Sequence, residues 1–170
     1  IQDIWRRVAE DFAPFNIDVT TEAPNSEDLK NSGPGDSRWG IRVAMTTNKN
    51  LLTNTAILNA GASSGGSAYL GSFNWATDDV CLVFNGYNAP DATSVYAAAE
   101  TVSHEVGHTL GLSHDGGSYG SDANYYEGHG SGDTSWGTIM GAPFINADEN
   151  VTTWSKGDYI GANNQEDDLG

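Results

Sequence analysis

Three histidines and a glutamate lie close together in the segment HEVGHTLGLSHD, which spans residues 104–115. His104 and His108 are four positions apart, so on a helix their side chains share one face, with Cβ atoms roughly 5–6 Å apart. Two imidazoles at that spacing can bind one metal ion at about 2.0–2.1 Å per nitrogen. The spacing therefore predicts a helix that carries two metal ligands.

The third predicted ligand is His114, which lies beyond the helix. A ligand on the next helical turn would not converge on the same ion, but Gly111 can end the helix because glycine adopts positive φ without a Cβ clash. The reversed chain then brings His114 to the ion from another direction. An isolated histidine is usually a surface or hydrogen-bonded core residue, but three of the four histidines here fall within eleven positions at ligand spacing.

Glu105 is the predicted general base and acid. It is rotated about a quarter turn from His104 on the helix, so it need not bind the metal and can face a water molecule there. Three neutral imidazoles leave a zinc ion with a net charge of +2 and an open position, and such an ion lowers the pKa of its water towards ~7. A carboxylate beside that water can accept its proton and pass it to a leaving amine. The predicted chemistry is peptide-bond hydrolysis.

The composition limits the class of protein. The chain has 170 residues, 7 Lys plus Arg and 23 Asp plus Glu, so its net charge is −16. This length fits one domain, and the charge argues against nucleic-acid binding. We find no run of roughly 18–20 apolar residues that could span a membrane, and one cysteine cannot form an internal disulfide. The acidity suits export, salt tolerance or calcium binding, which are not exclusive.

The hydrophobic pattern predicts the elements that position these residues. Apolar spacings of three and four predict helices over residues 2–12 and 91–110, the second of which carries the histidines. Alternating or continuous apolar residues predict strands over 17–21, 41–46, 67–73 and 80–85. Residues 22–40 and 115–135 are expected to be loops, residues 48–66 are irregular, and a short helix is expected to start near Thr152.

The sequence HEVGHTLGLSH resembles the long zinc signature HExxHxxGxxH of the metzincin metalloendopeptidases. Their second hallmark, a methionine-containing turn beneath the zinc, is matched by GTIMG at residues 137–141, in which Met140 would support the site. Asp115, directly after the third histidine, is similar to the reprolysin or adamalysin-like branch, where this carboxylate braces the turn. The chain most resembles bacterial secreted peptidases of that branch, also in WRRVAEDFAPFNIDVTTE, GSAYLGSF and WSKGDYIGANNQEDDL.

Two alternatives accompany this interpretation. The signature also resembles serralysins, but Ala142 stands where they carry tyrosine, and no GGxGxD calcium repeats follow. The second alternative, from another class, is a non-catalytic extracellular binding module on a metzincin scaffold. The intact motif argues against it.

The resemblance implies an α/β (α+β) fold: a twisted, mostly parallel sheet with one antiparallel edge strand, an active-site helix and a small irregular C-terminal subdomain. We expect one catalytic domain over residues 1–170, with an upper subdomain of about 1–114 and a lower one of about 115–170. The family places a strand before the first helix, so a strand and a propeptide are expected upstream. Residues 67–73 would form the edge strand that contacts substrate, through Ala68, Tyr69, Leu70 and Gly71. Phe144 and Ile145 would wall the pocket for the side chain that follows the scissile bond.

The resemblance further implies a zinc metalloendopeptidase of class EC 3.4.24 that acts on proteins or peptides. We expect a monomer that is secreted and extracellular. Structural calcium could bind near the C-terminus, although a solvated acidic tail is an equal alternative; the candidate ligands are Asn163, Asn164, Glu166, Asp167 and Asp168. His129 could stabilise an oxyanion, although a solvated loop histidine is the simpler interpretation.

Overall fold

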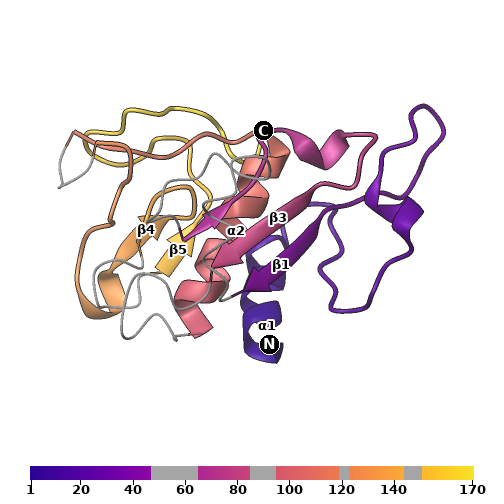
Figure 1. Cartoon of the computed structure of the whole chain (residues 1–170). Coiled ribbons are helices and arrows are strands. Elements are labelled where there is room, and N and C mark those ends of the chain that lie inside the picture. The colour runs from indigo at the N-terminus through magenta and orange to yellow at the C-terminus, as the bar shows by residue number, and fades with distance from the viewer. Residues whose placement is uncertain (47–64, 85–94, 119–122, 144–150) are drawn as a thin grey trace.

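The computed structural model describes residues 1–46, 65–84, 95–118, 123–143 and 151–170 (Figure 1). Its helices and strands follow one another in the order α1 (Gln2–Asp11), η1 (Ser26–Leu29), β1 (Arg42–Thr46), β2 (Gly66–Ser67), η3 (Ser72–Asn74), β3 (Val80–Phe84), α2 (Val95–Leu110), η4 (Gly132–Thr134), β4 (Trp136–Thr138) and β5 (Val151–Thr153). No helix in these ranges is long and apolar enough to cross a membrane.

The main sheet has the strand order β1-β3-β2. β1 pairs with β3 in parallel, and β2 pairs with β3 in the antiparallel direction, with Gly66 opposite Val83. The central strand β3 is the most buried of the three, which fits its continuous apolar sequence VCLVF. The expected mixed α/β fold with an antiparallel edge strand is therefore confirmed.

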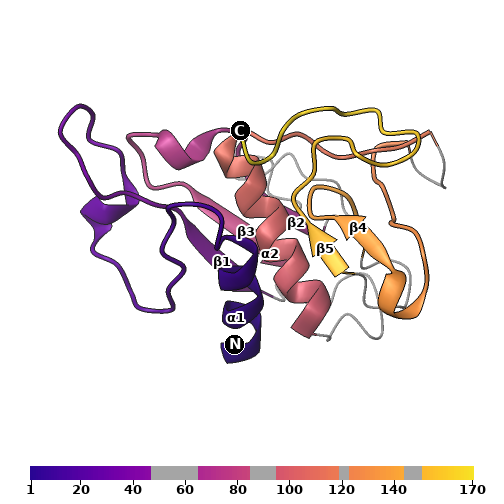
Figure 2. The ribbon, with the colours of Figure 1, turned by 180° about the vertical axis from the view of Figure 1, so that it is seen from behind.

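Both long helices pack on the same face of this sheet (Figure 2). α1 buries Val8, and Phe12, directly after the helix, is buried as well. The opposite side of α1 carries charged residues, as the apolar spacing predicted. α2 is buried along most of its length because the sheet, α1 and the C-terminal part of the chain surround it. The core combines these elements: Val8, Phe12, Cys81, Val83, Ala99, Val102, Val106, Ile139, Met140 and Trp154.

The predicted strand over residues 17–21 is wrong. The chain turns over residues 12–16, and residues 17–21 form no strand. Ile17 and Val19 pack against the core, and the carbonyl of Val19 accepts a hydrogen bond from Trp5 Nε1 at 2.6 Å. The alternating apolar residues thus reflect contact with the core and not strand pairing.

The predicted edge strand over residues 67–73 is far shorter than expected, since β2 ends at Ser67. Gly71 has a φ of 74°, which only glycine adopts readily, and its N–H donates to the carbonyl of His108 at 2.9 Å. The chain then enters η3. Residues 68–71 therefore turn over the end of α2 instead of extending the sheet.

The predicted helix near Thr152 is also wrong, because residues 151–153 form β5, which pairs in parallel with β4. Beyond it the backbone turns, with positive φ at Gly157 and Gly161, which is incompatible with a continuous helix. The Trp154 indole donates to the carbonyl of Asp11 at 2.6 Å. The apolar residues of this segment anchor a loop on α1.

The other predicted elements agree with the structure within its described ranges. The helices are found at Gln2–Asp11 and Val95–Leu110, and the strands at Arg42–Thr46 and Val80–Phe84. Residues 91–94, Asn85 and most of the segment 48–66 lie outside the described residues. The expected loop over 115–135 holds η4 and isolated bridges but no longer element among its described residues.

Candidate metal centre

The three predicted ligands come together at the C-terminal end of α2. His104 and His108 project from this helix, and one ligand-capable atom from each of His104, His108 and His114 lies within 4.8 Å of the others. Gly111 ends the helix with a φ of 107°, and its N–H donates to the carbonyl of His108. The reversal expected at this glycine therefore brings His114 back to the other two.

Backbone carbonyls fix the orientation of the two helical imidazoles. His104 Nδ1 donates to the carbonyl of Ile139 at 2.9 Å, and His108 Nδ1 donates to the carbonyl of Leu112 at 2.7 Å. With the proton on Nδ1, each ring keeps an Nε2 lone pair for a metal, which is the usual arrangement around metal-binding histidines. Nε2 of His108 and Nε2 of His114 are 2.9 Å apart. Two zinc bonds at a tetrahedral angle need roughly 3.3 Å, so small ring rotations suffice.

The electrostatics keep these imidazoles neutral. Burial lowers the pKa of His104 to about 3, with a further contribution from His108 and His114. Burial also lowers the pKa of His108. Neutral imidazole is the form that binds metal, and three nitrogen ligands suit zinc with one position left open. The donor set therefore fits a catalytic zinc ion.

Glu105 lies beside the triad without belonging to it. Its side chain is buried against β2, where a Cβ placed on Gly66 would lie 2.6 Å from Glu105 Oε1. Burial raises the pKa of Glu105 to about 8. A carboxylate with a high pKa in a protected position can hold and release a proton near neutral pH.

Met140 lies beneath α2 in the predicted turn. It is fully buried, and a Cβ on Gly107 of the helix would lie only 2.4 Å from its Sδ atom. The turn also connects ligand segments, because Ile139 accepts from His104 and the carbonyl of Met140 accepts from the Asp115 N–H at 2.9 Å. The turn thus supports the site from below.

Asp115 is fully buried directly after the third histidine. Its backbone N–H donates to the carbonyl of Met140 in the methionine turn, and its carboxylate lies beside Thr138 of the same turn. Burial raises the pKa of Asp115 to about 6, although the Thr138 hydroxyl lowers the pKa of this carboxyl. The backbone N–H of Asp115 therefore braces the turn, and the brace by its carboxylate stays a prediction.

Tyr125 was not anticipated from the sequence. Its ring lies 4.4 Å from that of His114 and 6.3 Å from that of His104, measured between centroids. It therefore forms a wall of the metal centre. Its position in a polar loop without periodicity left no sequence signal for this contact.

His129 lies in an aromatic cluster away from the ligand set. Tyr126 hydrogen-bonds to its Nδ1, and its backbone pairs with Trp136 in an isolated bridge. The side chain is exposed. Among the described residues, the group able to hold a metal consists of the three other histidines alone.

The C-terminal segment of residues 161–166, which we name the C-terminal clasp, holds the chain around the third ligand. Glu166 Oε2 accepts from the N–H of Ser113 at 2.8 Å, on the residue before His114. Asn163 Oδ1 accepts from the N–H of Gly116, and the Asn164 side chain donates to the carbonyl of His114. The clasp therefore holds the backbone of Ser113, His114 and Gly116 by hydrogen bonds.

The candidate calcium ligands have other partners here. The side-chain oxygens of Asn163 and Glu166 bind the backbone N–H groups given above, and Asn164 Oδ1 accepts from the N–H of Glu166. Asp167 and Asp168 accept from the N–H groups of Leu169 and Ser155. These bonds give the oxygens a structural role without a cation.

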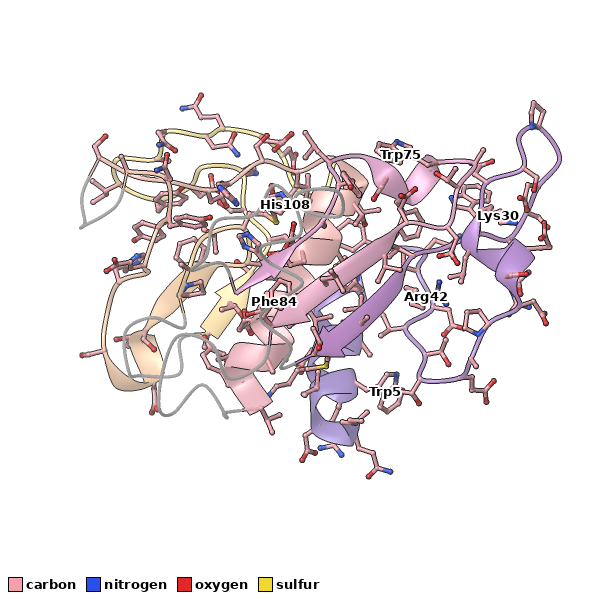
Figure 3. All side chains as sticks on the ribbon, in the orientation of Figure 1. Trp5, Lys30, Arg42, Trp75, Phe84 and His108 are labelled. Atoms are coloured by element: carbon pink, nitrogen blue, oxygen red, sulfur yellow. The ribbon has the colours of Figure 1, made fainter. Side chains whose placement is uncertain are left out.

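The expected substrate-contacting residues lie over the C-terminal end of α2, but not in a strand. Tyr69 and Leu70 are exposed, and the Tyr69 ring lies 5.7 Å from that of Trp75. Figure 3 shows Trp75 on the same upper side of the molecule as His108. Ala68 packs against the core, and the N–H of Gly71 is bonded to α2. Phe144 and Ile145 lie outside the described residues.

A helix with two histidine ligands, a third histidine after a glycine reversal and a methionine turn beneath them define a zincin-type metallopeptidase. A model of metallo-peptidase family M12 (Reprolysin_5) matches residues 14–155. The chain belongs to this family. A search of curated proteins finds no match.

Proposed function

We propose that the protein is a zinc-dependent endopeptidase of class EC 3.4.24. The observation that carries the proposal is the convergence of His104, His108 and His114, with the two helical rings held so that Nε2 is left for the metal. These three residues would hold Zn²⁺. When bound, the ion polarises the scissile carbonyl and acidifies a water molecule.

Glu105 is proposed as the proton carrier. Its buried carboxylate accepts a proton from the attacking water and delivers it to the leaving amine. The position between α2 and β2 shields this group from bulk water, so the proton stays at the reacting atoms. The Ile139 and Leu112 carbonyls keep their imidazoles in the neutral, metal-binding tautomer throughout.

The proposed substrate is an extended protein or peptide segment that crosses the molecule beside residues 68–71. The exposed apolar side chains of Tyr69 and Leu70 favour apolar substrate residues on that side. Phe144 and Ile145 are proposed as the wall of the pocket beyond the scissile bond. Because the expected strand is short here, fewer backbone pairs with substrate are available than a full edge strand would offer.

The remaining expectations are part of the same proposal. A secreted, extracellular monomer fits the net charge of −16 and the scarcity of lysine and arginine. A propeptide is proposed from the family resemblance alone. The division into an upper subdomain of about 1–114 and a lower one of about 115–170 fits the change from regular elements to loops at His114. A calcium ion would have to displace the hydrogen bonds of the C-terminal clasp or bind elsewhere.

The replacement Glu105→Ala tests the function. We expect it to keep zinc, because the three ligands remain, and to lose cleavage of casein by at least about 100-fold. Metal content by atomic absorption and peptide release report the two quantities separately. Glu10→Gln is the matched control, because Glu10 is an exposed glutamate on α1.

Near wild-type cleavage by Glu105→Ala would disprove the role of this residue. A wild-type protein that binds zinc but cleaves neither casein nor a peptide library would instead support the alternative of a binding module on this scaffold. Chelator-sensitive cleavage without added calcium would argue against a serralysin-like protease that depends on calcium repeats.

A further inference from the structure

Gly66 of the edge strand β2 lies directly against Glu105. It is buried and pairs with Val83 of the central strand. A Cβ on Gly66 would lie 2.5 Å from Glu105 Cγ, 2.6 Å from Oε1 and 2.7 Å from Cδ. Such distances are far below van der Waals contact, so the glutamate side chain occupies the space that a side chain at position 66 would need.

The backbone of Gly66 does not explain why glycine stands there. Gly66 is absent from the glycines with positive φ, so its conformation is open to any residue. In a strand glycine is unfavourable, because it costs conformational entropy and offers no side chain to pack. Glycine is therefore needed at position 66 for a steric reason: it leaves room for the side chain of Glu105.

Neither partner can easily move away. β2 is bonded to β3 on its inner side, and Cγ of Glu105 is close to the helix backbone, so it moves only if χ1 changes. α2 is itself packed between the sheet and the methionine turn. A methyl group at position 66 would thus displace the carboxylate from its present place.

We propose that Gly66 is a positioning residue whose missing side chain sets the location of the Glu105 carboxylate beside the metal. The inference rests on the proposed role of Glu105. Gly66 itself performs no chemistry; its effect is exerted through the rotamer of the glutamate. Because the Ile139 and Leu112 carbonyls hold the rings of His104 and His108, we expect metal binding not to depend on Gly66.

The test compares Gly66→Ala with Gly65→Ala, its neighbour in the chain. A Cβ on Gly65 would meet the Thr101 methyl at 3.8 Å, an ordinary contact. We expect Gly66→Ala to keep stoichiometric zinc and a KM within about threefold, while kcat falls by roughly 10–100-fold, since a displacement near 1 Å can cost that much. Gly65→Ala should keep kcat within about twofold. Equal kcat values for the two variants would overturn the proposal.

A double-mutant cycle on thermal unfolding tests the contact without any activity. Gly66→Ala should lower Tm by about 2–8 °C in the wild type, the expected cost of overpacking, and by at most about 2 °C in the Glu105→Ala background, where the colliding atoms are gone. An equal loss in both backgrounds would disprove the steric contact. If the cycle shows the contact but Glu105→Ala still cleaves casein, the proposed function fails while the contact stands.

Discussion

Residues 1–114 and residues 115–170 build the metal centre by different means. The first region contributes both long helices and the three-stranded sheet, whose apolar faces meet in one core. The second has two strands of three residues each, and its described part is otherwise turns, a 3-10 helix and loops. One region is held mainly by apolar packing and the other mainly by individual hydrogen bonds.

The second region nevertheless anchors in the core of the first. Ile139, Met140 and Trp154 pack against α1 and α2, and the Trp154 indole also bonds to the backbone of Asp11. Around these anchors, side chains such as Glu166 and Asn163 satisfy backbone groups of neighbouring loops. The third ligand, His114, therefore depends on polar contacts, whereas His104 and His108 depend on a packed helix.

A metal ion held by the three histidines would join α2 to the loop that leads into residues 115–170, and its removal is expected to have the largest effect. His104 and His108 belong to α2, whereas His114 begins the loop that the clasp holds. With a chelator we expect complete loss of proteolysis, and amide exchange at residues 113–118 and 161–166 faster by at least about 100-fold. Exchange in β3 should rise less than about tenfold. Hydrogen exchange read by mass spectrometry measures both regions in one experiment.

The matched control for this prediction is His129→Ala, which removes an exposed histidine outside the ligand set. It should respond to the chelator as the wild type does. Equal acceleration in β3 and in residues 113–118 would contradict the comparison, because it would mean that the two regions unfold together.

The first region could be predicted from sequence because its signals are periodic. Apolar residues at spacings of three and four gave α1 and α2, and the continuous run VCLVF gave β3. The ligand set could be predicted from spacing alone. Two histidines four positions apart share one face of a helix, and the chain reversal at Gly111 brings His114 back to them. The failure at residues 17–21 shows the limit: Ile17 and Val19 alternate like a strand but pack on the core without a partner strand.

The contacts of the second region could not be predicted, because they do not follow a periodic pattern in the sequence. Tyr125 meets His114 through loop geometry, and Glu166 reaches Ser113 across 53 positions of sequence. Short strands such as β5 are defined by a distant partner, so a local pattern near Thr152 could be misread as a helix. The methionine turn was found only through its resemblance to a family.

The next prediction concerns Glu100, which links α2 to β5. It is buried, its Oε1 accepts from the Thr152 hydroxyl at 3.1 Å, and its Oε2 has no partner. Burial, and then the charge of Asp11, raise the pKa of Glu100 from 4.5 to about 8, although Thr152 and Arg7 act in the opposite direction. It lines a cavity of about 480 Å³ between α1 and β5.

The sign of the pH effect follows from this raised pKa. Between pH 4.5 and about 8 the folded state keeps a proton that the unfolded state has lost, so this contribution is complete below pH 4.5 and is lost as pH rises through about 8. Relative to wild type, Glu100→Gln should therefore gain stability on going from pH 5 to pH 8.5, by on the order of 3 kcal/mol. Urea unfolding of both zinc-loaded proteins measures the difference. Glu22→Gln, at an exposed glutamate outside this cavity, should track the wild type at both pH values. A Glu100→Gln curve parallel to wild type would contradict the assignment.

The smallest expected effect lies in the C-terminal clasp. Glu166→Gln removes the charge from the bond to the Ser113 N–H, and the partly exposed site makes the loss about 1 kcal/mol in unfolding free energy. Because this bond holds the residue before His114, zinc affinity should fall about 5–10-fold, the scale seen for groups that orient metal ligands. Competition with a fluorescent chelator measures it. Asp167→Asn is the matched control, since the Asp167 carboxylate accepts from the N–H of Leu169 and not from residues 113–116. A similar zinc affinity for both variants would show that packing alone positions His114. The third ligand would then be held in the same way as the first two.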